Sequence, residues 1–581
     1  MSKPTSKVDA NRQLISDAKE AGTGALMVAY LRLSGPGWLQ SAITLGGGSL
    51  AGALFLGGLG GTSLLWLQLV AIAMGVIMLS AISYVTLSTG EKPFQAINNH
   101  INPVLGWGWL IATCMANMIW CMPQFGLCFA SLQKNLIGPT VGDSTNSKLA
   151  ISAMILVAAG FVVLLNQRQG LGAKIFDIFL KALVGMIVLC FFGVVVFLSI
   201  KGEVQWGSVF AGFIPDLQQW NAPTGDLKGL VAGLSPDLQG FWTSKIVTAQ
   251  RAVMIGAAAT AVGINMTFLL PYSMLNRGWD KPFRGLARFD LSTGMAIPYI
   301  LVTSCVVIAS FASFHAKIDK AFTSNDPAVV KTSPLFDGAK ATFLARIEHG
   351  VGGDAFAELS DDEKITKIAA LSIEEKRIGV SLVKRNAFQL SQALAPLLGE
   401  RNANVVFGLG IFGMGFSTII ILMLINGYAF CEMLGKPQGG TPYVIGCLVS
   451  GIFGAAWPLI WDGPAKLWLA ILTSSFGMML LPIAYFTFFM MMNSRTLMGK
   501  EKPTGVKMAI WNILMGVSVA GAVVAAGAAI WEKVAPMLGE SPTQKETLIG
   551  GLVGGVFIVY ILLVIVGFVM KRPENHDKPV S

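Results

Sequence analysis

Twelve apolar stretches, each about as long as a bilayer-crossing helix, follow one another along this 581-residue chain. Roughly 20 consecutive apolar residues cross the hydrocarbon core, where a helix satisfies its own backbone hydrogen bonds. With 54% hydrophobic and 13% charged residues, the chain is too apolar to fold as one soluble domain. The sequence therefore predicts an all-α polytopic membrane protein. Its predicted spans lie near residues 35–58, 62–88, 103–132, 149–166, 174–199, 252–275, 290–314, 404–429, 441–461, 466–493, 507–531 and 547–570.

Basic residues in the short loops predict how these spans are oriented. Lysine and arginine gather near 168–174, 277–288, 495–507 and 571–572, after even-numbered spans. Loops rich in these residues stay in the cytoplasm, so we expect both termini on the cytoplasmic side of a bacterial inner membrane. The net charge of +10 mostly reflects these cytoplasmic loops, and nucleic-acid binding is not expected. Anionic lipid head groups are the natural partners of the loops.

Three consecutive glycines, Gly46, Gly47 and Gly48, lie in the middle of the first span. Each glycine inside a helix costs roughly 1 kcal/mol relative to alanine. In lipid, every backbone group freed by a break must find a partner inside the protein. A helix broken at this depth is therefore expected to line a cavity and to offer its backbone dipoles to a transported solute.

The sixth span contains Asn265 and Pro271 in its middle stretch. Proline removes an intrahelical hydrogen bond and clashes with the preceding turn, so we expect a second interruption there. A simple kink in a continuous helix is the alternative. Interruptions in corresponding spans of two halves indicate a binding site near the bilayer midplane.

Four segments carry a resemblance to a known family: GPGWLQSAITLGGGSLAG, FLLPYSML, GMGFSTIIILMLINGYAFCEMLG and LPIAYFTFFMMMNSRTLMG. They are similar, in this order, to the first, sixth, eighth and tenth spans of the Nramp family of divalent-metal transporters. The resemblance runs from about residue 30 to 500 and implies the LeuT-type fold, in which five helices are repeated inverted, with two extra C-terminal helices. The resulting divisions are a cytoplasmic arm (1–34), a first repeat (35–199), an extracytoplasmic segment (200–251), a second repeat (252–493) with an extracytoplasmic insertion (315–403), and a part with the last two spans and a cytoplasmic tail (494–581).

The chain departs from the family's metal-binding pattern at several positions. Gly46 and Ser49 stand where the family has Asp and Asn, and Leu270 and Tyr272 replace its Met and His on span six. Span three has no acidic residue, and the polar group nearest to serving in its place is Gln124, beside Pro123. We therefore expect no carboxylate, imidazole or thioether at the family's metal positions, and no proton coupling of the usual kind. Neutral oxygen ligands suit a cation that keeps much of its water shell.

The resemblance implies a secondary carrier that works by alternating access on a divalent metal ion, hydrated Mg²⁺ or Mn²⁺. A half-helix N-terminus favours anions whereas free carbonyl groups favour cations, so two alternatives stay open. One is a carrier of a small anion or zwitterion, such as bicarbonate or an amino acid, with or without sodium coupling. The other is a non-transporting sensor that kept the fold. The chain has no nucleophile motif, phosphate loop or intramembrane acid pair, so neither an enzyme nor a cofactor is expected.

The candidate site residues come from spans one, six and eight. Ser417 and Thr418 match a position that resembles the hydroxyl pair holding a coupling sodium in LeuT-type folds. The predicted coupling-ion residues are Leu45, Ser417 and Thr418. The predicted substrate-binding residues are Gly46, Gly47, Gly48, Ser49, Gln40, Thr44, Asn265, Thr267, Leu270, Pro271, Tyr272 and Ser273.

Overall fold

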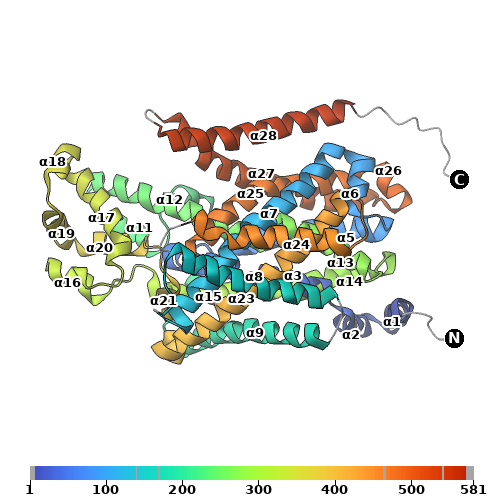
Figure 1. Cartoon of the computed structure of the whole chain (residues 1–581), viewed down its shortest axis with the longest axis horizontal. Coiled ribbons are helices and arrows are strands. Elements are labelled where there is room, and N and C mark those ends of the chain that lie inside the picture. The colour runs from blue at the N-terminus through green and yellow to red at the C-terminus, as the bar shows by residue number, and fades with distance from the viewer. Residues whose placement is uncertain (1–6, 139, 168–170, 462–465, 540–541, 571–581) are drawn as a thin grey trace.

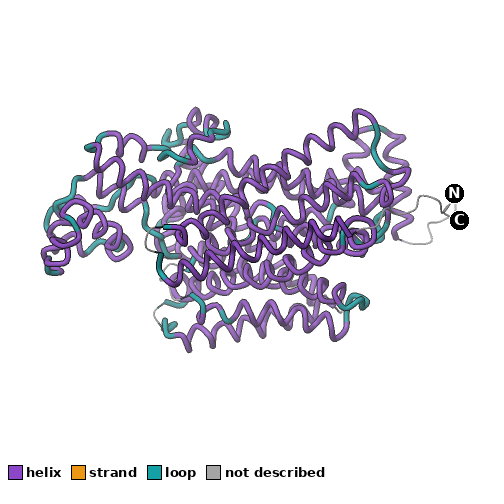
Figure 2. Tube along the Cα trace, turned by 90° about the horizontal axis from the view of Figure 1, so that it is seen from above, coloured by secondary structure: helices purple, strands orange, loops and turns teal. Residues whose placement is uncertain are grey.

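The computed structural model describes residues 7–138, 140–167, 171–461, 466–539 and 542–570. The described residues form helices joined by loops and contain no strand (Figure 2). Part of the predicted orientation depends on loop residues at 168–170 and 571–572, and those positions lie outside the described residues. The expected all-α fold is confirmed.

Every predicted span corresponds to a helix or to a pair of shorter helices. Nine of the described helical segments are long and apolar enough to cross a membrane by themselves, while spans one, five and nine contain shorter apolar helices. The helices of the first five spans are α3 (Pro36–Thr44) with α4 (Gly47–Gly60), α5 (Leu65–Thr89), α7 (Pro103–Ser131), α8 (Thr145–Gln167) and α9 (Leu171–Ile200).

The second half repeats the pattern of one divided helix followed by longer ones. A π-helical turn, η5 (Ser292–Ala296), joins the two helices of span seven. The helices of spans six to twelve are α12 (Pro236–Ala261) with α13 (Ile264–Asn276), α14 (Arg284–Leu291) with α15 (Ile297–Phe314), α23 (Glu400–Met433), α24 (Gly440–Ala455), α25 (Trp468–Asn493), α27 (Gly505–Val534) and α28 (Gln544–Met570).

Short helices lie at the two ends of this bundle. Figure 1 shows α1 and the last turns of α28 at one end of the molecule, with a lobe of small helices at the other. We call residues 201–235 and 315–399, which form that lobe, the cap. The helices near the opposite end are α1 (Lys7–Ala21), α2 (Thr23–Leu33), α6 (Pro93–Ala96) and α26 (Arg495–Met498). The helices of the cap are α10 (Trp206–Ala211), α11 (Asp226–Ala232), α16 (Pro327–Lys331), α17 (Phe336–Val351), α18 (Gly353–Glu358), α19 (Asp361–Ala369), α20 (Ile373–Ser381), α21 (Ala387–Ser391) and α22 (Ala395–Leu398).

The first span is interrupted where the glycines predict it. The Leu45 N–H group donates to the Ser41 carbonyl at 2.8 Å and ends α3, and Gly46 is extended with φ −76° and ψ 178°. Helix α4 then starts at Gly47, so its first N–H groups have no carbonyl partner within the helix. The prediction of a break at Gly46 to Gly48 is confirmed.

The sixth span is also interrupted, at a different residue from the one expected. Helix α13 continues through Pro271, and the break lies at Val262 and Gly263, which both have extended backbone between α12 and α13. The expectation of a break at Pro271 is therefore wrong. Gly263 is required because a Cβ atom there would lie 2.4 Å from the Trp120 ring of α7. The two broken helices pack together, α4 against α12 and α3 against α13.

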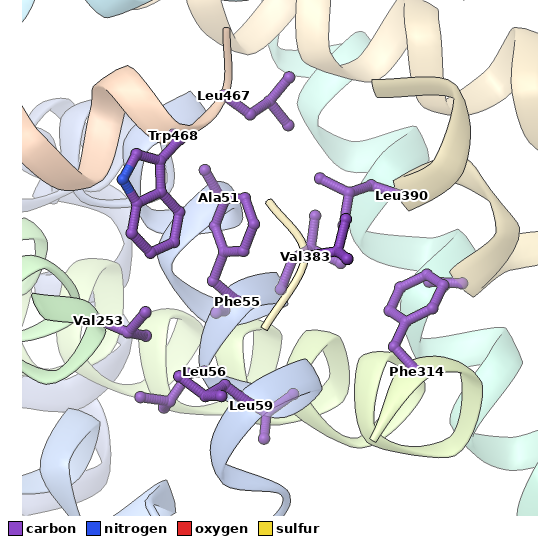
Figure 3. Packing of buried hydrophobic residues seen from close by; sticks show 14 of the residues in the cluster. Ala51, Phe55, Leu56, Leu59, Val253, Phe314, Val383, Leu390, Leu467 and Trp468 are labelled. Carbon is purple, nitrogen blue, oxygen red and sulfur yellow. The ribbon is translucent and has the colours of Figure 1, made fainter. Parts of the chain in front are cut away.

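The cap is packed onto the ends of several spans. Val383 and Leu390 of the cap belong to the same buried apolar cluster as Phe55 of α4 and Phe314 of α15 (Figure 3). The Phe55 ring also makes an edge contact with Trp468 of α25, with ring centroids 4.9 Å apart. These apolar contacts cover the end of α4 that points away from the glycine break, and the cap therefore closes this end of the bundle.

Candidate functional site

A cavity of about 50 Å³ lies between the two helix breaks. A single water molecule needs at least roughly 10 to 15 Å³ of such space, so the cavity has room for an ion with a few waters. Helices α4, α7, α12, α13, α23 and α25 contribute to its wall. One described methionine, Met266, lines the cavity. The glycine, amide and hydroxyl residues of the wall are Gly46, Gly48, Ser49, Gln124, Thr260, Gly263, Asn265, Thr418, Thr473 and Ser474.

Two glycines of the first break have different roles in this wall. A Cβ atom on Gly46 would lie 2.6 Å from Thr418 Oγ1 and 2.8 Å from the Ile43 carbonyl oxygen, so this residue allows the helices to approach closely. A Cβ atom on Gly48 would meet only the Thr260 methyl group at 3.6 Å and the Gln124 amide nitrogen at 3.9 Å. Gly48 therefore leaves open space that a larger side chain would occupy.

Hydroxyl groups in the wall all use their hydrogen atoms inside the protein. Each lies within hydrogen-bond distance of a backbone carbonyl oxygen, which accepts but cannot donate, so the hydroxyl must be the donor. The remaining lone pairs are then available only as acceptors. The donations are Ser49 to Thr260 (3.2 Å), Thr260 to Ala257 (2.8 Å), Thr418 to Met414 (2.7 Å), Thr473 to Leu469 (2.9 Å) and Ser474 to Ala470 (2.6 Å).

Two amide side chains of the wall have atoms without a partner among the described residues of the protein. Gln124 Oε1 and Asn265 Nδ2 are both buried and unpaired. Asn265 Oδ1 accepts the Met266 N–H group at 2.8 Å, which fixes the orientation of that amide. A buried polar atom without a partner costs about 1 to 3 kcal/mol, so both atoms require solvent or a ligand in the cavity.

Met266 places a sulfur atom in the wall that the sequence comparison did not find. The comparison aligned the family's methionine with Leu270, which instead packs in a buried apolar cluster on α13. Met266 lies four residues earlier, beside the break, and its Sδ atom is 3.6 Å from the Thr44 hydroxyl. The sequence has no thioether at the Leu270 position, whereas the cavity has one from Met266.

The cavity brings together five of the predicted residues: Gly46, Gly48, Ser49, Asn265 and Thr418. The amide and hydroxyl residues of the wall that the predicted set omitted are Gln124, Thr260, Thr473 and Ser474. A lone glutamine beside a proline in an apolar span is a signal for Gln124, since buried polar groups in spans are costly. The hydroxyl residues carry no comparable signal, because such groups commonly bond to the preceding helical turn.

The other predicted residues lie outside the cavity wall. Thr267 accepts the Trp109 indole N–H group at 3.0 Å, and the Tyr272 ring stacks on a phenylalanine of its own helix. Ser273 and Ser417 donate to carbonyl groups of the preceding turn at 2.8 and 3.0 Å. These polar groups stabilise helices rather than face the cavity. The predicted residues outside the wall are Gln40, Thr44, Leu45, Gly47, Thr267, Leu270, Pro271, Tyr272, Ser273 and Ser417.

The N-terminus of α3 is held by a buried carboxylate from span seven. Asp290 accepts the Gly37 N–H group at 2.6 Å and the Gly35 N–H group at 3.1 Å. A Cβ atom on Gly37 would lie 2.3 Å from the Asp290 carbonyl oxygen, so glycine is needed for this close approach. The negative charge of Asp290 also complements the positive end of the α3 dipole. The half-helix before the glycine break is therefore fastened to span seven.

Comparisons with known proteins match most of this architecture. The sequence profile of the family described as natural resistance-associated macrophage protein-like (Nramp) matches residues 37–345 and 365–532. The divalent metal cation transporter MntH of Brucella suis biovar 1 (strain 1330) is 24% identical over 337 residues, which cover 56% of this chain and 64% of that protein. The chain thus spans slightly less than two thirds of this curated relative.

Solved structures of a manganese transporter from Eremococcus coleocola have the same fold. A mutant of that transporter superposes with a TM-score of 0.61 at 16% identity, covering 93% of this chain and 94% of the other. The complex of the transporter with an aromatic bis-isothiourea substituted compound gives a TM-score of 0.60 at 15% identity, covering 94% of each chain. These matches confirm the predicted LeuT-type fold, and the helices confirm an integral membrane protein. Because the family profile matches well over half of its residues, the chain belongs to the Nramp family.

Proposed function

We propose that this protein is a secondary carrier that moves a divalent metal ion, Mg²⁺ or Mn²⁺, by alternating access. The ion would bind between the two helix breaks and keep part of its water shell. Family membership supports this proposal, as do the two relatives whose names refer to divalent metal and manganese transport. We further propose that both termini are cytoplasmic and that the cap lies on the opposite side of the membrane, in agreement with the positive loops.

The observation that carries the proposal is that the hydroxyl groups of the wall already donate their hydrogen atoms to backbone carbonyl groups. Water bound to a metal ion directs its O–H groups outward and needs acceptors around it. The wall supplies such acceptors from Ser49, Thr260, Thr418, Thr473 and Ser474. The free-energy cost of entering a neutral cavity is lower for a hydrated divalent ion than for a bare one, because the hydrated ion keeps its waters.

A second candidate is a carrier of a small anion or zwitterion. It is favoured by the N-termini of α4 and α13, where Gly48 and Asn265 line the cavity. Asn265 Nδ2 adds an unpaired donor at the same place. Anions bind where N–H groups and the positive dipole end converge. The hydroxyl acceptors oppose this reading, because they offer no hydrogen atoms to an anion.

The two candidates are separated by uptake into proteoliposomes made with the full chain. The panel contains Mg²⁺, Mn²⁺, bicarbonate and amino acids, each with and without a sodium or proton gradient. The proposal expects uptake of Mg²⁺ or Mn²⁺ that does not require a proton gradient. Uptake of bicarbonate or an amino acid without metal flux would instead identify the anion or zwitterion carrier. Protein-free liposomes give the background for each solute.

Gln124 provides a sharper test of the metal site. Replacing it with leucine, Gln124→Leu, removes the unpaired acceptor Oε1 and is expected to raise the apparent KM for the metal about fivefold, since a neutral hydrogen bond contributes about 1 kcal/mol. Gln124→Glu places a negative charge beside the cation and is expected to lower the KM, more for Mn²⁺ than for Mg²⁺. Radioisotope or dye-based uptake measures both constants.

The control for these variants is Gln68→Leu. Gln68 is also a buried glutamine with an unpaired Oε1, but it lies on α5 and does not line the cavity. Its replacement has the same chemistry and should leave the KM for metal unchanged. Equal KM values for the Gln124 and Gln68 variants would contradict the assignment of Gln124 to the site.

A further inference from the structure

A second, smaller cavity of about 20 Å³ lies beneath the cap. It is bounded by residues Ser381 to Leu390 of the cap and by the cap-facing ends of α4, α12, α15 and α25. Figure 3 shows its apolar surroundings, in which Val383 lies near Phe55 and Phe314 lies near Leu390. One positively charged side chain, Arg385, also lines it.

Arg385 has few protein partners for a buried charge. The residue is only 6% exposed, and its one described hydrogen bond is a long one, from Nη2 to the Val380 carbonyl at 3.5 Å. Its guanidinium lies over the Phe314 ring, 4.9 Å from the centroid. Among the described residues, no carboxylate forms an ion pair with it or shifts its titration. The guanidinium therefore has four of its five N–H donors left for another acceptor.

The charge of Arg385 remains at neutral pH. Burial lowers the pKa of this guanidinium to about 10, which still leaves it protonated. The neighbouring Lys384 adds a second positive group, with its ammonium 4.8 Å from the centre of the Trp468 ring. Aromatic faces stabilise these cations only in part. A buried charge without a counter-charge is costly, so the arrangement favours the binding of an anion.

We propose that the cavity beneath the cap binds one small inorganic anion such as chloride, held by the Arg385 guanidinium. The volume limits the ligand, because about 20 Å³ accommodates one or two water-sized particles and excludes an amino acid. The Ser381 hydroxyl also lines the cavity, but it donates to the Arg377 carbonyl at 2.8 Å, so the donors come from Arg385.

A bound anion would hold the cap against the bundle. Residue Arg385 belongs to the cap, whereas Phe314 and Phe55 belong to spans seven and one. Neutralising the guanidinium removes the cost of keeping it in this apolar interface, so the anion stabilises the arrangement in which the cap covers α4. The proposed anion site does not depend on which solute binds in the central cavity.

The test compares the melting temperature of the purified full chain in detergent with sodium chloride and with sodium gluconate at equal ionic strength. Chloride is expected to raise the melting temperature of the unaltered protein by a few degrees, as a ligand of the folded state does. In Arg385→Gln the difference is expected to disappear. This variant should fold, because the neutral amide removes a buried charge. The control Arg401→Gln changes an exposed arginine of α23 and should keep the full chloride effect.

A direct measurement accompanies the thermal one. Crystals of the unaltered protein grown with sodium bromide are expected to show an anomalous bromine peak beside Arg385. The proposal is overturned if no such peak is found there, or if chloride stabilises Arg385→Gln as much as the unaltered protein. The bromide measurement decides the matter even if the variant does not fold, and neither outcome bears on metal uptake.

Discussion

Gly48→Leu is expected to abolish metal uptake while the protein still folds and inserts into the membrane. A Cβ atom at this position makes only ordinary contacts, so the backbone of α4 tolerates it. The three further carbon atoms of leucine extend into a cavity of about 50 Å³ and take the space of the ion and its waters. Uptake into proteoliposomes measures the loss, and size-exclusion chromatography in detergent checks that the fold is retained.

Gly48→Ala is the matched control for this variant. Its single methyl group would meet Thr260 at 3.6 Å, an ordinary van der Waals distance, so substantial uptake should remain. Alanine also favours the helix by about 1 kcal/mol relative to glycine, which argues against instability as a cause of any loss. Near-normal uptake by Gly48→Leu would show that the solute does not pass through the cavity beside the glycine break.

Asp290→Ala is expected to release α3 from span seven. The Gly35 and Gly37 N–H groups lose a charged acceptor, and hydrogen bonds to charged groups contribute about 1.5 to 3 kcal/mol each. A loss of about 3 kcal/mol shifts the equilibrium between the fastened and released positions of α3 roughly 100-fold. Uptake should fall, because the proposed alternating-access mechanism would require the closed position of this half-helix as well as the open one.

The release of α3 can be measured through a cysteine placed at Ser41, a residue of α3 that is buried in the fastened position. Maleimide labelling of the peptide that contains Ser41→Cys, followed by mass spectrometry, should be at least tenfold faster when Asp290→Ala is added. Asp290→Asn keeps one acceptor oxygen and should give a smaller increase. Asp280→Ala is the control, because Asp280 forms a half-exposed ion pair with Arg12. Equal labelling rates with and without Asp290 would refute its role as a fastening residue.

The spans and the first helix break were predictable from the sequence for simple physical reasons. Hydrophobic length determines which segments cross a bilayer, and three glycines in one turn remove the side-chain contacts that keep a helix straight. The second break was misplaced because Pro271 is a stronger local signal than Val262 and Gly263. In the folded protein the Trp120 ring occupies the space beside Gly263, and this contact between distant helices is not visible in the sequence.

The site was only partly predictable, because its wall is built from residues on several helices. Gly46, Gly48 and Ser49 were found since they belong to the break itself. Gln124 and Thr473 face the cavity only because α7 and α25 are packed around it. The position of Gln124 beside a proline is a local signal, whereas no local pattern distinguishes Thr473 from structural polar residues. The alignment with the family's motif selected Leu270 instead of Met266, because the alignment was anchored on Pro271 and the helix break lies at Val262 and Gly263.

Among the described residues, the wall of the central cavity includes no carboxylate, imidazole or amine. A ligand that must lose a proton before it can bind a metal makes the affinity depend on pH. Amide and hydroxyl oxygens need no such loss, so the proposed metal binding would release no protons from the wall. The carrier proposed for this chain would therefore keep the same affinity in an acidified compartment as at neutral pH, where a carboxylate site would weaken.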